Sequence, residues 1–140
     1  MNTLTKKVFS FKPEFFSQDF TLLLFRILVS LSMINTHGLK KIKDFEGTIA
    51  HIPDPLGVGG EVSAIMAIIA NIIAPIFIIF GFATRLAILP ILAVTLMGFF
   101  IVHGNDPWAI RDVPAMYSLV FIALLLLGPG KYSIDHKIFK

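Results

Sequence analysis

The sequence predicts an all-α integral membrane protein, a bundle of four short transmembrane helices that forms a single domain over residues 1–140. Hydrophobic residues make up 56% of the chain and charged residues only 15%, whereas a soluble domain carries about 25% charged residues. The apolar residues gather into four runs, and none has the polar face that a helix of a soluble bundle needs. We therefore expect lipid to surround most of the chain.

The spans are expected at about residues 20–36, 62–82, 86–102 and 108–127. A helix rises about 1.5 Å per residue and the hydrocarbon core is about 30 Å thick, so the spans are at the short end of the membrane-spanning range. The fourth reaches that length only if its polar start, Arg111 and Asp112, is included. Residues 38–61 are rich in turn-forming proline and glycine and are expected to form an outer loop.

Charge predicts the orientation of the bundle. Four spans place both termini and the turn at Thr84-Arg85 on one side, which then carries seven lysine and arginine residues against four on the other. The positive-inside rule therefore puts the N- and C-termini in the cytoplasm. The first span is expected to be retained, because residues 35–40 make a poor cleavage site for a signal peptidase.

Composition excludes several kinds of chemistry. The chain has no cysteine, which rules out disulfides, thiolate nucleophiles and cysteine-ligated metals within it. The sequence has no basic stripe with interleaved aromatic residues, so nucleic-acid binding is not expected. His37 and His103, the two histidines at the outer ends of the spans, are too few ligands for a zinc site, so no metal site is predicted. They would have to face each other across a cavity to ligate haem, and haem is not expected.

Two polar residues inside the spans need an explanation, because intramembrane polar groups are costly. Arg26 lies about six residues into the first span. It either snorkels to the cytoplasmic interface or forms an inward ion pair or anion site. Asn71 lies near the middle of the second span, where a hydrogen bond between helices is a simpler explanation than a ligand contact. Its expected partners are Ser30, Ser32 or Thr95.

A cluster of polar side chains is expected at the outer face. His37 ends the first span and His103 ends the third, and both of these helices run outward in the predicted topology. The fourth span begins at the same face with Trp108, Arg111 and Asp112. Imidazole and carboxylate groups exchange protons near neutral pH, so the cluster could receive protons from a reduced quinol. The alternative is that helix ends simply collect polar residues.

Candidate roles follow from this cluster. Three residues are candidates for proton transfer: His37, His103 and Asp112. Five are candidates for binding a quinone-type cofactor: Arg26, His37, His103, Trp108 and Arg111.

Four motifs occur in a characteristic order. They are Arg26 followed by His37-Gly38-Leu39-Lys40-Lys41, the turn Phe80-Gly81-Phe82-Ala83-Thr84-Arg85-Leu86, His103, and the tail Leu127-Gly128-Pro129-Gly130-Lys131-Tyr132-Ser133-Ile134-Asp135. The ordered set resembles the DoxX family of small four-helix bacterial membrane proteins, over residues 25–138. The resemblance implies a multi-pass protein of the bacterial inner membrane. Some relatives are subunits of a thiosulfate:quinone oxidoreductase.

The chain departs from the family pattern at two places. Many members carry a glutamate near the position of Asn71, and another at the start of the fourth span, where this chain has Arg111-Asp112. Asp112 could substitute for the second carboxylate. If those glutamates move protons in relatives, Asn71 puts the same role in doubt here.

Three functions are compatible with these observations. The first is a membrane subunit of a redox complex that binds a quinone headgroup at the outer cluster and works with a redox partner protein. The second is a non-enzymatic scaffold that docks a partner protein. The third is a small-solute transporter, which in so short a chain would require a homo-oligomer or an internal repeat.

Overall fold

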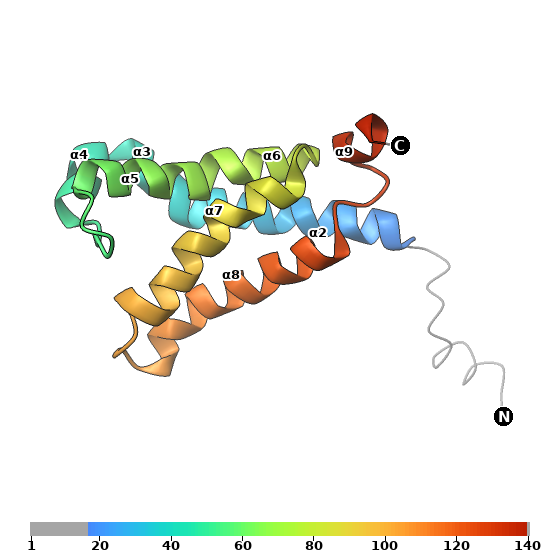
Figure 1. The fold of residues 1–140 in the computed structure, drawn as a ribbon. Coiled ribbons are helices and arrows are strands. Elements are labelled where there is room, and N and C mark those ends of the chain that lie inside the picture. Colours follow the sequence, from blue (N-terminus) through green and yellow to red (C-terminus); the bar gives the residue numbers. More distant parts are fainter. Residues whose placement is uncertain (1–16, 140) are drawn as a thin grey trace, which may run out of the picture.

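The computed structural model describes residues 17–139, and within that part of the chain all regular secondary structure is helical (Figure 1). Four helical segments are long and apolar enough to cross a membrane: Gln18–Lys43, Gly60–Phe80, Thr84–Val102 and Trp108–Leu127. The predicted all-α membrane bundle is therefore confirmed. The sequence also predicts that residues 8–20, which mix phenylalanines with charged residues, lie along the membrane interface, and most of them fall outside the described residues.

Three of the four spans are composite helices. The first consists of α2 (Gln18–Met33), the π-helical segment η1 (Ile34–Gly38) and α3 (Leu39–Lys43). The second consists of α5 (Gly60–Ile68), the π-helical η2 (Ile69–Ile73) and α6 (Ala74–Phe80). The third joins α7 (Thr84–Met97) to the π-helical η3 (Gly98–Val102), and the fourth is the single helix α8 (Trp108–Leu127).

The spans pack so that the beginning of α2 and the end of the described chain lie at one end, which we call the tail end (Figure 1). The opposite end, which we call the loop end, carries α3, α4 and the start of α5. Helix α7 packs on α8, and α6 packs on both α2 and α7. The small core includes the fully buried Ile78, Ile88 and Phe121. Large apolar residues such as Leu86 and Leu126 are 68% and 75% exposed, which is the surface expected against lipid.

Most of the segment expected as an outer loop is helical, which corrects that part of the prediction. The first span continues through Gly38 to Lys43, because Gly38 keeps right-handed helical backbone angles within the π turn and does not end the helix. A separate helix, α4 (Phe45–His51), then begins at Asp44, whose carboxylate accepts a hydrogen bond from Gly47 N at 2.9 Å. Within residues 38–61, only Asp44 and residues 52–59 lie outside a helix.

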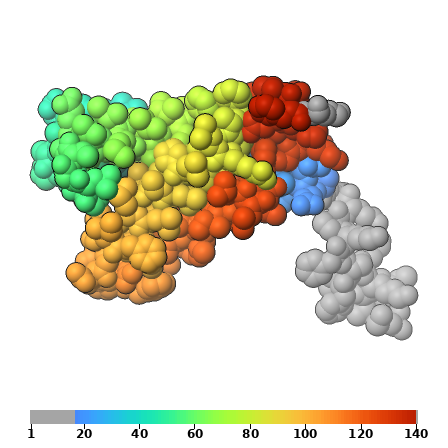
Figure 2. Space-filling model, viewed as in Figure 1, coloured from blue at the N-terminus to red at the C-terminus, as the bar shows by residue number. Residues whose placement is uncertain are grey.

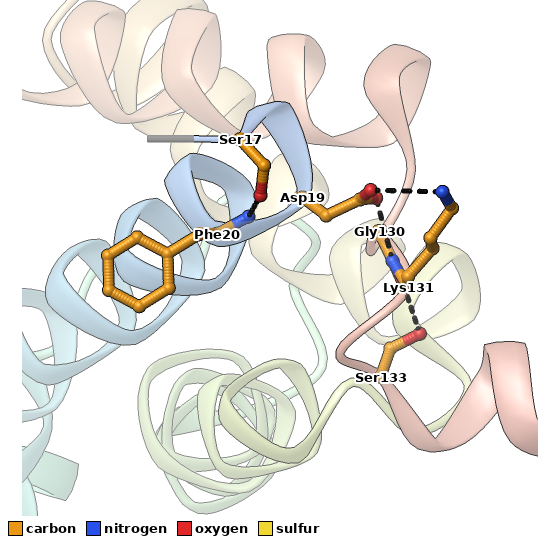
Figure 3. Close-up of polar contacts among 6 residues, drawn as sticks. All are labelled: Ser17, Asp19, Phe20, Gly130, Lys131 and Ser133. Carbon is orange, nitrogen blue, oxygen red and sulfur yellow. Dashed lines mark hydrogen bonds and ion pairs between the residues drawn. The ribbon is translucent and has the colours of Figure 1, made fainter. Parts of the chain in front are cut away.

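The polypeptide after the fourth span folds back on the tail end of the bundle, and we call residues 128–135 the C-terminal clasp. The Asp19 carboxylate on α2 accepts a hydrogen bond from Lys131 N at 3.0 Å and lies 3.6 Å from Lys131 Nζ (Figure 3). Ser133 Oγ donates to Gly130 O at 2.6 Å (Figure 3). The same hydroxyl accepts from His136 N and caps α9 (Ile134–Ile138).

Arg26 is the buried centre of this arrangement. Its side chain is 1% exposed, and its two terminal nitrogens donate to the carbonyl oxygens of Pro129 and Tyr132 in the clasp. Burial contradicts the prediction that Arg26 snorkels to the interface, and the described residues form no ion pair with it. An anion site at Arg26 stays a prediction. Backbone carbonyls bind the two terminal nitrogens, because the glycines and proline of the clasp end the helix and turn its carbonyls inward, whereas the buried Nε has no hydrogen-bond partner among the described residues.

The clasp also ties down the turn between the second and third spans. The Asp135 carboxylate accepts hydrogen bonds from Ala83 N at 2.7 Å and Thr84 N at 2.9 Å, the first donors of α7. Gly81 lies against the clasp with φ +67°, and a Cβ added there would be 2.5 Å from Ser133 Cβ. The family-like motifs at Arg26, at the turn and in the tail thus meet in one structural unit.

Candidate functional site

A cavity of about 340 Å³ opens between the four spans at the loop end. Residues 52–56 form a loop that covers the cavity. Figure 2 shows two separate projections at this end of the molecule. One is formed by the region around this loop, and the other by the region around the turn that precedes α8. Most of its lining is apolar. The polar lining residues are His37, Lys41, Ser63, Asn71, Thr95, His103 and Tyr117.

All three π-helical segments contribute to this cavity. His37 belongs to η1, Asn71 to η2, and Gly98 and Val102 to η3. Each segment breaks the regular α-helical bonding of a span at the depth of the cavity. Because π turns are rare and frequently lie at functional sites, their convergence marks this cavity as the candidate site.

The first and second spans approach each other closely beside the cavity. A Cβ added to Gly38 would be 2.7 Å from the carbonyl oxygen of Asn71 and 2.5 Å from the side chain of Ile72. That carbonyl cannot accept the usual helical bond from the residue four positions later, because Pro75 has no N–H. Gly38 therefore permits η1 to pack directly against the irregular part of the second span.

His37 contributes an imidazole that packing holds in place. Its ring lies edge-on to the ring of Tyr117, with the centroids 5.2 Å apart. Its Nε2 is buried and has no hydrogen-bond partner among the described residues. One turn later, Lys41 Nζ donates to the carbonyl oxygen of His37 at 2.6 Å, which holds a cation at the edge of the cavity.

His103 contributes a second imidazole, at the end of the third span. Its Nδ1 lies 2.7 Å from Asp106 Oδ2. A carboxylate at that distance favours the proton on Nδ1 and leaves Nε2 as the acceptor. The Asp106 carboxylate therefore orients the ring.

Asn71 is buried and lines the cavity. The hydrogen bonds predicted for it to Ser30, Ser32 or Thr95 are absent from the described structure. Thr95 Oγ1 accepts from Ser118 Oγ at 2.9 Å, and Ser30 Oγ has no partner among the described residues. Ser32 pairs instead with the hydroxyl of Tyr117 at 3.0 Å. The carboxamide of Asn71 is thus available to a molecule in the cavity.

The polar start of the fourth span does not reach the cavity. Trp108, Arg111 and Asp112 are not part of its lining, although we expected them beside the two histidines. The guanidinium of Arg111 lies 4.4 Å from the ring centroid of Phe99 and 5.8 Å from that of Trp108. Asp112 is exposed. Arg26 is at the opposite end of the bundle, within the clasp.

Helical phase explains this result. The residues of α8 that line the cavity are Ile110, Val113, Pro114 and Tyr117. The last three follow Ile110 by three, four and seven positions. Such spacing defines one face of a helix, and residues 108, 111 and 112 fall on other faces. Of the predicted site residues, the structure brings only His37 and His103 to the same cavity.

Tyr117 and Lys41 line the cavity, although the sequence analysis gave neither of them a role in the site. Tyr117 is a phenol within an apolar run, and this intramembrane polar group is the signal that could have identified it. Lys41 was counted only as an interfacial charge. The continuation of the first helix to Lys43 is what carries Lys41 to the cavity, one turn beyond His37.

Four apolar spans around a mostly apolar cavity with a few convergent polar groups define a small multi-pass membrane protein with an internal cavity of ligand size. The DoxX family model matches residues 21–104, and the chain belongs to the DoxX family. The chain is also 32% identical over 127 residues to the inner membrane protein YqjF of Escherichia coli (strain K12), an alignment that covers 88% of this chain and 95% of that protein. No solved structure matches the chain. The relative and the four spans confirm the predicted location, the bacterial inner membrane.

Proposed function

We propose that the chain binds the headgroup of a quinone-type lipid in the cavity and acts as a membrane subunit of a redox complex. The observation that carries the proposal is the meeting of two imidazoles, His37 and His103, in one mostly apolar cavity between membrane-spanning helices. The orientation with both termini in the cytoplasm remains part of this proposal, and it would place the cavity at the outer side of the membrane.

The size and lining of the cavity support a ligand of this class. Its volume of about 340 Å³ lies in the range of small-molecule sites, roughly 300–1,000 Å³. Apolar residues such as Met33, Met66 and Met97 suit the faces of a substituted ring, and methionine adapts readily to irregular shapes. The prenyl tail of such a molecule would extend into the surrounding lipid.

The polar lining residues supply the hydrogen bonds that ring oxygens need. The unpartnered, buried Nε2 of His37 can accept a proton or hydrogen bond from a ring hydroxyl. The Asn71 carboxamide and the Lys41 ammonium can donate to a ring carbonyl. His103, held by Asp106, offers a second proton acceptor.

Oxidation of a bound quinol would release two protons and two electrons. His37 and His103 would each accept one proton, since imidazole is the side chain that changes charge near neutral pH. The two electrons would pass to a redox partner protein, which the proposal requires.

A binding measurement on the purified chain in lipid nanodiscs tests the proposal. The probe is a short-chain benzoquinone analogue, and the variants are His37→Gln and His103→Gln. We expect the parent to bind and each variant to lose about tenfold in affinity, the effect of one hydrogen bond of about 1.4 kcal/mol. His136→Gln is the matched control, because His136 is exposed on α9 at the tail end.

Absence of quinone binding in the parent would reject the proposal and favour the scaffold hypothesis. Equal losses in the His136 control and in the cavity variants would show that the histidines act through general stability. Each variant therefore needs a thermal unfolding curve beside its binding curve.

A further inference from the structure

A second depression at the loop end lies beside the cavity and differs from it in character. It has a volume of about 580 Å³, and we call it the lysine groove. Its lining residues are Lys40, Lys41, Lys43, Asp44, Gly47, Thr48, His51, Ile52 and Pro53, all from α3, α4 and the turns that follow them. Lys40 and Lys43 line the groove but not the cavity.

No lysine of the lysine groove forms an ion pair within the described part of the chain. The ion pairs found there are His103 with Asp106 and Lys131 with Asp19. Asp44 also lines the groove, where its carboxylate caps α4, and the three lysines of the lining exceed its single negative charge. Lys40 and Lys43 are exposed and three residues apart on α3, so they share one face of that helix.

The groove lies at the depth where a membrane helix meets lipid headgroups. The apolar first span ends at Lys43, so the lysines stand at the boundary between hydrocarbon and water. Basic side chains at this depth attract anionic lipid, with an affinity gain of roughly fivefold per residue. A groove with two exposed ammonium groups on one face can contact a single phosphate from two directions.

We propose that the lysine groove is a site for the phosphate group of an anionic phospholipid, contacted by Lys40 and Lys43. The acyl chains of this lipid cover the apolar surface of the neighbouring helices, while its phosphate neutralises the groove. The site is distinct from the proposed quinone site, since neither of these two lysines lines the cavity. It gives the chain a preference for acidic lipid at its loop end.

Native mass spectrometry of the chain in detergent mixed with phosphatidylglycerol or phosphatidylcholine tests this site. The variant is Lys40→Gln/Lys43→Gln. The matched control is Arg85→Gln/Lys137→Gln, which removes the same charge from two exposed positions at the tail end. We expect the parent and the control to retain phosphatidylglycerol in preference to phosphatidylcholine, and the lysine variant to lose roughly tenfold to thirtyfold in that affinity.

Inorganic phosphate provides the second arm of the experiment. If a phospholipid is the ligand, free phosphate at matched concentration leaves lipid retention unchanged. Displacement of the lipid by free phosphate would overturn the assignment to lipid. Unchanged affinity in the lysine variant, or an equal loss in the control, would overturn the site itself. Quinone binding by the lysine variant should stay at the parental level, which separates this test from that of the cavity.

Discussion

The ring of His37 lies edge-on to the ring of Tyr117, with centroids 5.2 Å apart and planes at 85°. This contact joins the first span to the fourth across the candidate cavity. The Tyr117 hydroxyl forms a hydrogen bond of 3.0 Å with the Ser32 hydroxyl. This bond holds the phenol in place and does not involve the imidazole of His37. An aromatic contact, rather than a hydrogen bond, therefore positions His37 and leaves its Nε2 available to a ligand.

Replacement of Tyr117 should separate the role of its ring from that of its hydroxyl. Tyr117→Phe keeps the edge-on contact, and we expect parental affinity for a short-chain quinone. Tyr117→Leu removes an aromatic pair of about 0.5–1.5 kcal/mol, and we expect a loss of up to about tenfold in affinity. The dissociation constants of both variants in nanodiscs check this prediction. A large loss in Tyr117→Phe would instead assign the role to the hydroxyl.

Removal of the Arg26 guanidinium should destabilise the bundle. Arg26→Leu leaves the carbonyls of Pro129 and Tyr132 without these donors, and each lost partner of a buried group costs about 1–3 kcal/mol. We therefore expect a loss of about 2–6 kcal/mol in the free energy of unfolding, measured by denaturation in detergent. Arg26→Lys should recover only part of it, because an ammonium cannot reproduce the planar fork of the guanidinium. Arg85→Leu, at an exposed position, is the control and should change little.

Two glycines with nearly the same backbone angle offer a paired test of the clasp. Gly57 has φ +66° and open space around its missing Cβ, whereas Gly81 has φ +67° and Ser133 Cβ 2.5 Å away. Gly57→Ala should cost only the backbone penalty, about 1–2 kcal/mol. Gly81→Ala adds a steric clash and should lower the free energy of unfolding by a further 1 kcal/mol or more, about the cost of overpacking. Equal thermal stabilities of the two variants would show that the clasp gives way freely.

The spans could be predicted from the sequence because lipid imposes a simple rule, a long apolar run without a polar face. The meeting of His37 and His103 followed from the same rule, since two helices that run in the same direction end at the same face. The phase of α8 was harder to predict. Trp108 and Arg111 share the depth of the histidines, but they lie on faces of α8 that do not line the cavity.

The local structure around the site depends on interactions that sequence patterns do not encode. The π turn η1 keeps the first helix intact through Gly38, although glycine there resembles a helix end. Arg26 finds its partners more than 100 residues away, in backbone carbonyls of the clasp. Every residue has a backbone carbonyl, so no side-chain pattern predicts which carbonyls will accept hydrogen bonds from a guanidinium.

Acidification should loosen the loop that covers the cavity. The Gly59 amide donates to the Asp54 carboxylate at 2.8 Å, the Ser63 hydroxyl donates at 2.9 Å and the Val58 amide at 3.0 Å. These hydrogen bonds lower the pKa of Asp54 below its ordinary value of 3.8, and the one from Gly59 has the largest effect. A carboxyl whose pKa is lower in the folded state stabilises that state above its unfolded pKa. The stabilisation is therefore complete at neutral pH and is lost as the pH falls below 3.8 through the folded value.

Hydrogen exchange measures this effect directly. After correction for the intrinsic rate, the amides of Val58 and Gly59 should be protected down to about pH 4 and lose protection below it. Asp54→Asn should show weaker protection with no such step. A step that persists in Asp54→Asn would assign the transition to a different carboxyl.

The orientation of the bundle can be measured because the chain contains no cysteine. Single cysteines introduced at exposed positions, Glu46→Cys at the loop end and Lys137→Cys at the tail end, give one reporter for each side. The sequence assigns seven lysine and arginine residues to the side of the two termini and four to the other side, which predicts that the tail end faces the cytoplasm. A membrane-impermeant maleimide should therefore label Glu46→Cys in cells with a permeabilised outer membrane, and Lys137→Cys only after the inner membrane is lysed. The reverse pattern would place the cavity at the cytoplasmic face, so that protons taken up by His37 and His103 would be released inside the cell rather than outside it.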